Sequence, residues 1–216
     1  NLQLKLNSLK NFFYIYNIIY YIMSLDDKRL KLLVENSVNG GYTYDVAKVV
    51  HYLYKDKYVC GKLKNKLWFH FENHKWKETE LGPYKELSTN ILNLFEEYKN
   101  KLDVVNDKGI IDKTESLILK LKNVSFKENI CRECLYLFYK PDFIYGLDRE
   151  INLICFNNGV WDIQNKTFRN GEKEDYISLS IDMTYNNSEN IDIAINQFID
   201  YRKKILNKRS PNYVFK

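Results

Sequence analysis

The residues between positions 62 and 77 are the strongest candidate for a binding surface in this sequence. Three lysines occupy a predicted loop, two side chains of the next strand share one face of it, and two more lysines lie on the strand after that. Lysine neutralises phosphate and bases stack on aromatic rings, so the pattern indicates a site for single-stranded nucleic acid. Its members are Lys62, Lys64, Lys66, Trp68, His70, Lys75 and Lys77.

The same stretch also has a purely structural interpretation. Trp68 and Trp76 would anchor the core of a small sheet, and the lysines would only solvate its surface. A small sheet needs one buried aromatic face to be stable, and we therefore favour this interpretation over direct contact with DNA. Both interpretations predict the same sheet. They differ in whether nucleic-acid bases or the protein core cover its aromatic face.

Motifs for catalysis are missing from the sequence. The eight glycines form neither the phosphate-binding loop of nucleotide hydrolases nor the dinucleotide fingerprint. The three histidines form no HExxH pair, and no serine nucleophile elbow occurs. Cys131 and Cys134 make a single CxxC inside a predicted helix, which indicates core packing in preference to a metal or redox site. We therefore expect no catalytic residue, no metal and no cofactor on this chain.

The composition leaves the partner open. The net charge is +5 at pH 7, from 33 Lys and Arg against 28 Asp and Glu. A mild basic balance suits an anionic partner. It also follows from an AT-rich genome, which favours the codons of Lys, Asn, Ile, Tyr and Phe. Four scattered cysteines do not form a disulfide framework, so we expect a reducing, intracellular compartment.

Hydrophobic periodicity predicts an α+β fold in which small antiparallel β-meanders pack with amphipathic helices. Helices are expected over 25–38, 43–56 and 83–98, then from Asp112 and from Ser125, each of which begins a capping-box pattern. Pro141 should end that run. A last helix should cover 188–206, with Phe198 and Tyr201 on its apolar face. Strands are expected over 58–60, 67–71 and 75–78, and again over 151–156, 160–163, 167–169 and 176–180, with a hairpin turn at 157–159.

The N-terminal part is predicted to stand apart from the rest. Residues 12–23 are strongly apolar but shorter than a membrane span, so we expect a buried helix or a poorly structured extension, and no membrane partner. Asn39, Gly40 and Gly41 are the best linker candidate. These features divide the chain into an extension with linker (1–41) and a module (42–216). The chain starts with Asn1 and not with Met, so we expect a fragment or a processed product.

An ordered series of segments resembles the helicase-associated domain of poxvirus and giant-virus primase–helicases, which phage and plasmid proteins share. Its strongest part runs from Leu147 and Asp148 through 154–162 to 168–171 and 174–178. Weaker parts are 44–48, 53–60, 67–69 and 74–76. The resemblance covers about 160 residues, from Tyr42 to the C-terminus, which is a typical domain length.

The resemblance implies a non-catalytic module of a viral DNA replication protein. In that family the module lies between a primase and a superfamily 3 helicase motor. It would link the two, guide single-stranded or forked DNA, and help form the collar of a ring homo-oligomer. ATP and Mg²⁺ would belong to the motor and not to this chain, and the expected location is the host cytoplasm. Two alternatives stay open: a stand-alone single-stranded nucleic-acid-binding or adaptor protein, and a small enzyme with an unrecognised motif.

Overall fold

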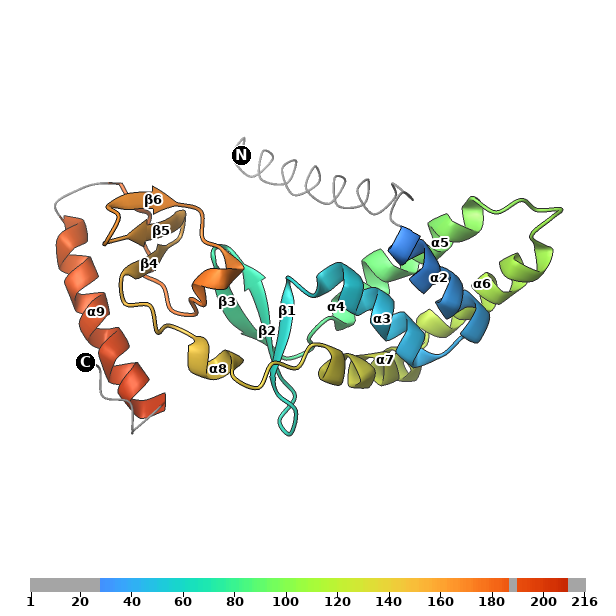
Figure 1. The fold of residues 1–216 in the computed structure, drawn as a ribbon, viewed down its shortest axis with the longest axis horizontal. Coiled ribbons are helices and arrows are strands. Elements are labelled where there is room, and N and C mark those ends of the chain that lie inside the picture. The colour runs from blue at the N-terminus through green and yellow to red at the C-terminus, as the bar shows by residue number, and fades with distance from the viewer. Residues whose placement is uncertain (1–27, 187–189, 210–216) are drawn as a thin grey trace.

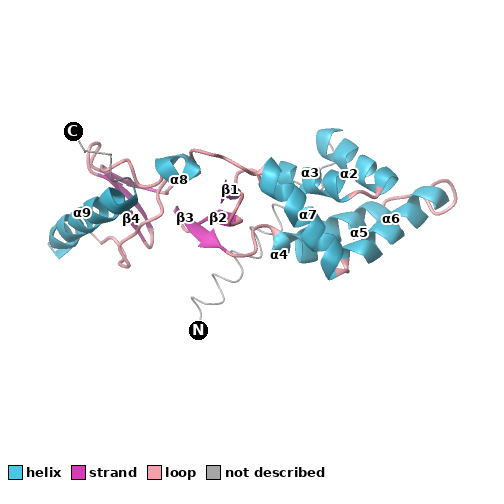
Figure 2. Ribbon diagram, turned by 90° about the horizontal axis from the view of Figure 1, so that it is seen from below, coloured by secondary structure: helices cyan, strands magenta, loops and turns pink. Residues whose placement is uncertain are grey.

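The computed structural model describes residues 28–186 and 190–209. These residues are arranged along one long axis, with helices at one end, a three-stranded sheet in the middle, and a second sheet with a long helix at the other end (Figure 1). The view from below keeps this order (Figure 2). Helices and two small antiparallel sheets make an α+β fold, as predicted. The apolar segment 12–23 lies outside the described residues, and no described helix is long and apolar enough to cross a membrane.

The helical lobe is built around α3 (Thr43–Tyr54), which packs against α2 (Lys28–Gly40) and α7 (Val124–Leu137). The spacing of Val46, Val49 and Val50 places all three on one face of α3, and this face is fully buried. The other members of the lobe are α4 (Tyr84–Glu86), a π-helical turn (Leu87–Ile91), α5 (Leu92–Asn100) and α6 (Lys108–Leu121). The single helix predicted over 83–98 therefore contains an irregular turn.

The predicted linker and the two predicted capping boxes differ from what the structure shows in this lobe. Asn39 and Gly40 end α2, and only Gly41 and Tyr42 separate it from α3, so the predicted linker is a short turn between two helices that share one core. Both predicted capping boxes are wrong. Helix α6 begins at Lys108, which places Asp112 inside it. Helix α7 begins at Val124, where the Asn123 side chain accepts hydrogen bonds from the amides of Ser125 and Phe126.

The first sheet is the predicted meander, in the order β1 (Tyr58–Lys62), β2 (Leu67–Glu72) and β3 (Lys75–Thr79). Strands β2 and β3 meet at a two-residue turn in which Asn73 and His74 both have positive φ, the backbone that suits a tight hairpin. A bulge at Gly61 interrupts the pairing of β1 with β2. A Cβ at Gly61 would lie 2.8 Å from the Ile144 side chain, so the absence of a side chain at Gly61 lets α8 (Phe143–Gly146) approach the sheet.

Both faces of this sheet are covered. Tyr58, Cys60 and Trp68 belong to the core of the helical lobe. On the other face, Val59, Phe69 and Trp76 pack with Phe143 and Leu147, in and just after α8. The aromatic residues of the sheet are therefore shared between two cores, one on each side.

The second sheet is another meander, in the order β4 (Leu153–Phe156), β5 (Gly159–Asp162) and β6 (Thr167–Arg169). Helix α9 (Asn190–Arg209) lies along it (Figure 1). Phe198 packs with Ile154 and Phe156, and the buried Arg202 donates to the carbonyls of Leu153 (2.7 Å) and Glu150 (2.6 Å). Tyr201, predicted for this apolar face, is 55% exposed instead, because its neighbour Arg202 faces the sheet.

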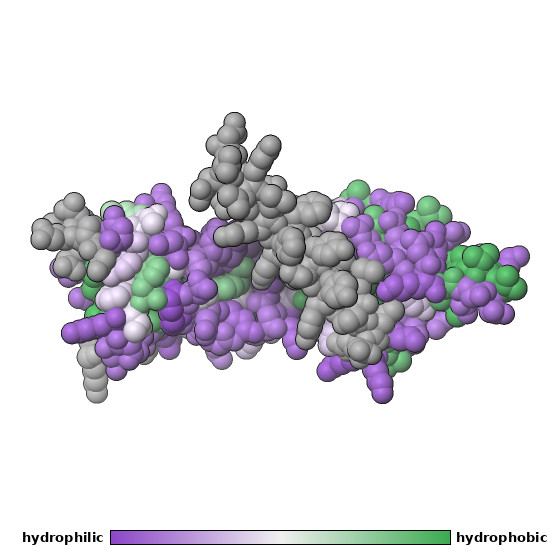
Figure 3. All heavy atoms as spheres, turned by 90° about the horizontal axis from the view of Figure 1, so that it is seen from above, coloured by the Kyte–Doolittle hydropathy of each residue, from purple (hydrophilic) through white to green (hydrophobic). Residues whose placement is uncertain are grey.

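The segment 171–180 joins the two sheets and is not the predicted strand. It begins with a 3-10 turn (Lys173–Asp175), Tyr176 has a left-handed backbone, and Ser180 makes only an isolated bridge to Cys155. The Ile177 carbonyl accepts a hydrogen bond from the Trp76 amide (2.7 Å), which fastens this segment to β3. At the opposite end of the molecule, hydrophobic atoms gather on the surface where α5 and α6 are joined (Figure 3), and Val104 and Val105 of that loop are 79% and 86% exposed.

Candidate nucleic-acid interface

The first three lysines of the predicted surface lie at the end of β1 (Lys62) and in the loop that follows it (Lys64 and Lys66). Lys62, Lys64 and Lys66 are all exposed, and the loop projects from the middle of the molecule (Figure 1). Among the residues that the structure describes, none forms an ion pair with these three ammonium groups. We refer to residues 62–66 as the basic loop. It presents three uncompensated positive charges, which is what a phosphate backbone requires.

Trp68 does not take part in this surface. Its side chain is 3% exposed, and its ring packs edge-on against Phe138 with 5.6 Å between ring centroids. A base needs an open ring face to stack on, so a stacking role for Trp68 is excluded in this conformation. Trp68 and Trp76 are core anchors, as the structural interpretation predicted.

The predicted set is divided between the two ends of the sheet. The basic loop precedes β2, whereas His70, Lys75 and Lys77 lie toward the turn that follows it. Lys62 pairs with Leu67, so at about 3.3 Å per residue it lies about 10 Å along the strand from the level of His70 and Lys77, and about 17 Å from that of Lys75. The predicted residues are therefore spread along the sheet and do not form one compact cluster.

His70, Lys75 and Lys77 already have hydrogen-bond partners within the protein. Lys77 Nζ donates to Glu72 over 3.2 Å, His70 Nε2 lies 3.4 Å from the same carboxylate, and Lys75 Nζ donates to the Ser180 hydroxyl. Burial alone would raise the pKa of Glu72, but the hydrogen bonds from Lys77 and His70 outweigh it and hold that pKa below its ordinary value. Because Glu72 is charged near neutral pH, it competes with any phosphate for Lys77. The basic loop is the better candidate.

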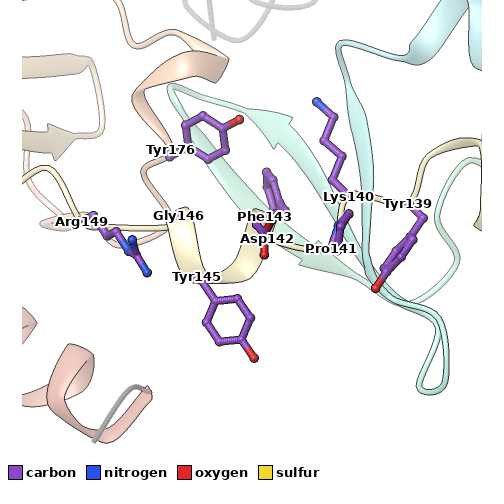
Figure 4. A pocket seen from close by; sticks show the side chains of 9 residues that line it. All are labelled: Tyr139, Lys140, Pro141, Asp142, Phe143, Tyr145, Gly146, Arg149 and Tyr176. Carbon is purple, nitrogen blue, oxygen red and sulfur yellow. The ribbon is translucent and has the colours of Figure 1, made fainter. Parts of the chain in front are cut away.

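A groove beside the basic loop was not predicted from the sequence. It follows α8 and encloses about 770 Å³. We call it the α8 groove. Figure 4 shows the phenol rings of Tyr139 and Tyr145 and the guanidinium of Arg149 extending to the same side of the chain. The groove is lined by Tyr139, Lys140, Pro141, Asp142, Phe143, Tyr145, Gly146, Arg149 and Tyr176.

Backbone pairing places this groove next to the basic loop. The Cys60 amide donates to the Phe138 carbonyl (3.0 Å), and the Lys140 amide donates to the Cys60 carbonyl (3.1 Å). Tyr139 therefore lies beside β1, as a parallel bridge to Cys60, and the basic loop begins two residues later. The available sequence signal was the stretch 139–145, in which two tyrosines and a lysine surround Pro141. The prediction used Pro141 only as the end of a helix.

The described residues provide no centre for metal chemistry. Within residues 28–186 and 190–209, no group of three or more His, Cys, Asp or Glu side chains could hold a metal ion. The thiols of Cys131 and Cys134 belong to the helical core, and burial raises the pKa of both. What this surface offers is positive charge and exposed aromatic rings, which suit binding.

Comparison with known proteins places these features in a family. A family model described as D5 N terminal like matches residues 47–202. "Putative helicase L207/L206" of Acanthamoeba polyphaga mimivirus is 30% identical over 211 residues, covering 87% of this chain and 22% of that protein. The chain thus spans about a fifth of the length of this relative.

Two further viral proteins are similar over shorter stretches. "Putative helicase 121R" of Invertebrate iridescent virus 3 is 38% identical over 71 residues, covering 33% of this chain and 8% of that protein. "Putative helicase 022R" of Frog virus 3 (isolate Goorha) is 23% identical over 180 residues, covering 64% of this chain and 18% of that protein.

Proposed function

The chain belongs to the D5 N terminal like family, and from this we propose that it is a non-catalytic module of a viral primase–helicase of superfamily 3. The module would link the primase to the ATPase motor and contact single-stranded or forked DNA. Support comes from the three viral relatives, whose names all describe helicases. In this proposal ATP and Mg²⁺ bind to the motor domain and not to this chain. The host cytoplasm stays the expected location.

The observation that carries the DNA contact is the basic loop. Lys62, Lys64 and Lys66 are exposed, lie within five residues of each other and have no acidic partner among the described residues. A lysine that is already paired must give up its partner to bind a phosphate, whereas these three need not. Contact of this kind depends on charge and not on base sequence, which suits a module that guides DNA toward a motor.

The test is the salt dependence of DNA binding by this chain. Fluorescence anisotropy of a labelled thymidine oligonucleotide should show an affinity that falls steeply between about 50 and 200 mM salt. A variant with Lys62→Glu, Lys64→Glu and Lys66→Glu should bind more weakly. Each phosphate contact on a single strand contributes about 0.7 to the slope of log affinity against log salt, so the loss of three contacts should lower that slope by about 2.

A control variant carries the same change in net charge at another place. Lys28, Lys101 and Lys108 are exposed on the helical lobe, and their replacement by Glu should leave most of the affinity and the salt slope intact. Equal losses in the two variants would mean that only net charge matters, and the assignment of the contact to the basic loop would then be abandoned.

The collar of a ring is the second part of the proposal. Val104 and Val105 form an exposed apolar tip at the end of the helical lobe, and exposed apolar residues of this kind can serve as contacts between copies. Replacement of both by Ser should reduce any self-association measured by sedimentation velocity, without changing DNA affinity at low protein concentration. Self-association that is unchanged by the two substitutions would place the ring contact elsewhere.

A further inference from the structure

We propose that the α8 groove binds bases of single-stranded nucleic acid by stacking, while the basic loop holds the neighbouring phosphates. This inference rests on the proposed function and adds to it a site and a strand preference. In duplex DNA the bases are stacked on each other, so their faces are not available to the groove. The groove would therefore favour single strands, whereas the basic loop alone would accept either form.

The groove offers aromatic surface that is open to solvent, although the Tyr176 ring also packs against Phe143. Tyr139, Tyr145 and Tyr176 are 39%, 57% and 36% exposed. Every base has a π-face, so stacking on such rings tolerates any sequence. The hydroxyl of tyrosine can form hydrogen bonds with water while the ring face stays apolar, which makes tyrosine suitable for a groove open to solvent. The volume of about 770 Å³ lies within the usual range of about 300–1,000 Å³ for ligand sites.

The floor of the groove is rigid. Phe143 is 3% exposed and packs edge-on against Trp76, with 5.0 Å between ring centroids. The Phe143 ring also lies 5.2 Å from the Phe69 ring and 5.7 Å from the Tyr176 ring, so three aromatic side chains fix its position. A preformed floor lowers the entropy lost on binding, since the groove need not be ordered by its ligand.

Tyr176 is held in a backbone conformation that is rare for a bulky residue. Its φ is +50°, which costs energy for any residue with a side chain. The Tyr176 carbonyl accepts a hydrogen bond from the Asp148 amide (2.7 Å), and its ring lies against Gly146, where a Cβ would be 3.4 Å away. Strained residues persist where the surroundings fix them, and they cluster at ligand sites. Here the Tyr176 ring lies over Gly146 and Phe143, at the edge of the groove.

The charges around the groove select an anionic ligand. Lys140 and Arg149 contribute positive charge and Asp142 contributes one negative charge, so the lining is net positive. The basic loop extends this positive charge, since it starts two residues after the backbone pair between Cys60 and Lys140. An acidic peptide would satisfy the charges and leave the tyrosines unused. A single strand uses both, with its phosphates on the basic loop and its bases on the rings.

The test compares three probes on the full chain: a thymidine oligonucleotide, an abasic oligonucleotide of equal length, and a duplex. The double variant Tyr139→Ala, Tyr145→Ala should lose about tenfold or more in affinity for the thymidine strand. It should bind the abasic strand and the duplex as the wild type does, because these depend on the basic loop. The double variant Tyr139→Phe, Tyr145→Phe keeps the rings and should bind all three probes normally.

Tyr42→Ala is the matched control, since Tyr42 is 70% exposed on the helical lobe and lies outside the groove lining. It should change no affinity. A thymidine oligonucleotide with one 5-iodouracil should also crosslink to Tyr139 or Tyr145 on irradiation, as peptide mass spectrometry would show. The crosslink identifies the binding site on the wild-type chain, so it tests the proposal even if the alanine variant folds poorly.

The two proposals fail in different ways. If the chain binds the thymidine strand with strong salt dependence, and the alanine variant binds it equally well or the crosslinks map elsewhere, the stacking site is wrong while the DNA contact stands. If the wild-type chain binds none of the three probes, the proposed DNA contact fails, and the groove proposal fails with it.

Discussion

The hydroxyl of Tyr58 donates a hydrogen bond to the carboxylate of Glu86 over 3.0 Å. Tyr58 begins β1 and Glu86 ends α4, so the bond joins the first sheet to the helical lobe. The same carboxylate, only 5% exposed as a residue, accepts from Lys57 Nζ (2.8 Å) and Asn90 Nδ2 (2.7 Å). A buried carboxylate requires such partners, and here they come from the start of β1 and from the π-helical turn. Glu86 is therefore a specific joint between the helical lobe and the sheet that carries the basic loop.

Replacement of Glu86 by Gln should destabilise the protein in a pH-dependent way. Burial alone would raise the pKa of Glu86, but the hydrogen bonds from Lys57, Tyr58 and Asn90 hold it below its ordinary value. A lowered folded-state pKa stabilises the protein above the unfolded pKa, and this contribution is lost as the pH falls through the folded pKa. We expect a loss of about 1–3 kcal/mol near pH 7 that shrinks below about pH 4, measured by urea unfolding.

The control for this prediction is Glu128→Gln, an exposed glutamate on α7. It should change the free energy of unfolding by less than about 0.5 kcal/mol at either pH. A Glu86→Gln variant that behaves like the control would show that the carboxylate is not a stabilising joint.

Gly82→Ala should destabilise the core around Trp68. Gly82 has a φ of +52°, and a Cβ there would lie 2.6 Å from the Trp68 ring. Strain and overpacking together should lower the free energy of unfolding by about 1–3 kcal/mol. Gly109→Ala is the matched control, because Gly109 lies in α6 with no atom near its Cβ position. It should raise stability by up to about 1 kcal/mol, and thermal unfolding of both variants would check the opposite signs.

The hydrophobic pattern was sufficient to predict the helices and meanders, but not what covers the sheet. Period 2 correctly places Trp68 and His70 on one face of β2. It does not say that Phe138, at the end of α7, covers the ring of Trp68, or that Phe143 covers the opposite face. Those partners come from about 70 residues further along the chain. The choice between a stacking surface and a core therefore required the structure.

The candidate site shows the same limit. The basic loop is local in sequence, and its three lysines were predicted from their spacing alone. The α8 groove combines Tyr139 and Tyr145 with Tyr176, which is brought close by an unusual backbone conformation and by its hydrogen bond to Asp148. Tyrosine is abundant in this chain, with 18 residues, so an exposed tyrosine carries no signal by itself. Only the fold separates these three from the others.

Asp148 should be essential for the position of Tyr176. Its carboxylate is buried and accepts hydrogen bonds from the amides of Ser178 (2.7 Å) and Leu179 (3.0 Å), and from the Ser178 hydroxyl. Asp148→Ala would leave two amides without this acceptor and should cost at least about 2 kcal/mol. Asp148→Asn keeps one acceptor oxygen and tolerates the positive φ at this position, so it should cost less.

The measurement for Asp148 is urea unfolding together with binding of the thymidine and abasic strands. Under the groove proposal, Asp148→Ala should weaken thymidine binding more than abasic binding, because Tyr176 is displaced while the basic loop is not, and Asp148→Asn should weaken it less. Stability close to the wild type in Asp148→Ala would contradict the structural role, since the two amides would then have found other acceptors.

The cysteines of the CxxC pair should be chemically inert in the folded chain. Burial, with Glu128 nearby, raises the pKa of Cys131 to about 12, and burial raises the pKa of Cys134 as well. Only the thiolate reacts with disulfide reagents, and at about pH 8 it is about one part in 10,000 for a pKa of 12, against about one in four for an ordinary thiol. We expect slow labelling of the native chain by DTNB, a rate that increases with pH, and labelling of all four free cysteines in guanidinium chloride. Rapid labelling of Cys131 in the folded chain, or its protection by added Zn²⁺, would instead indicate a redox or metal site and contradict the assignment of this pair to the core.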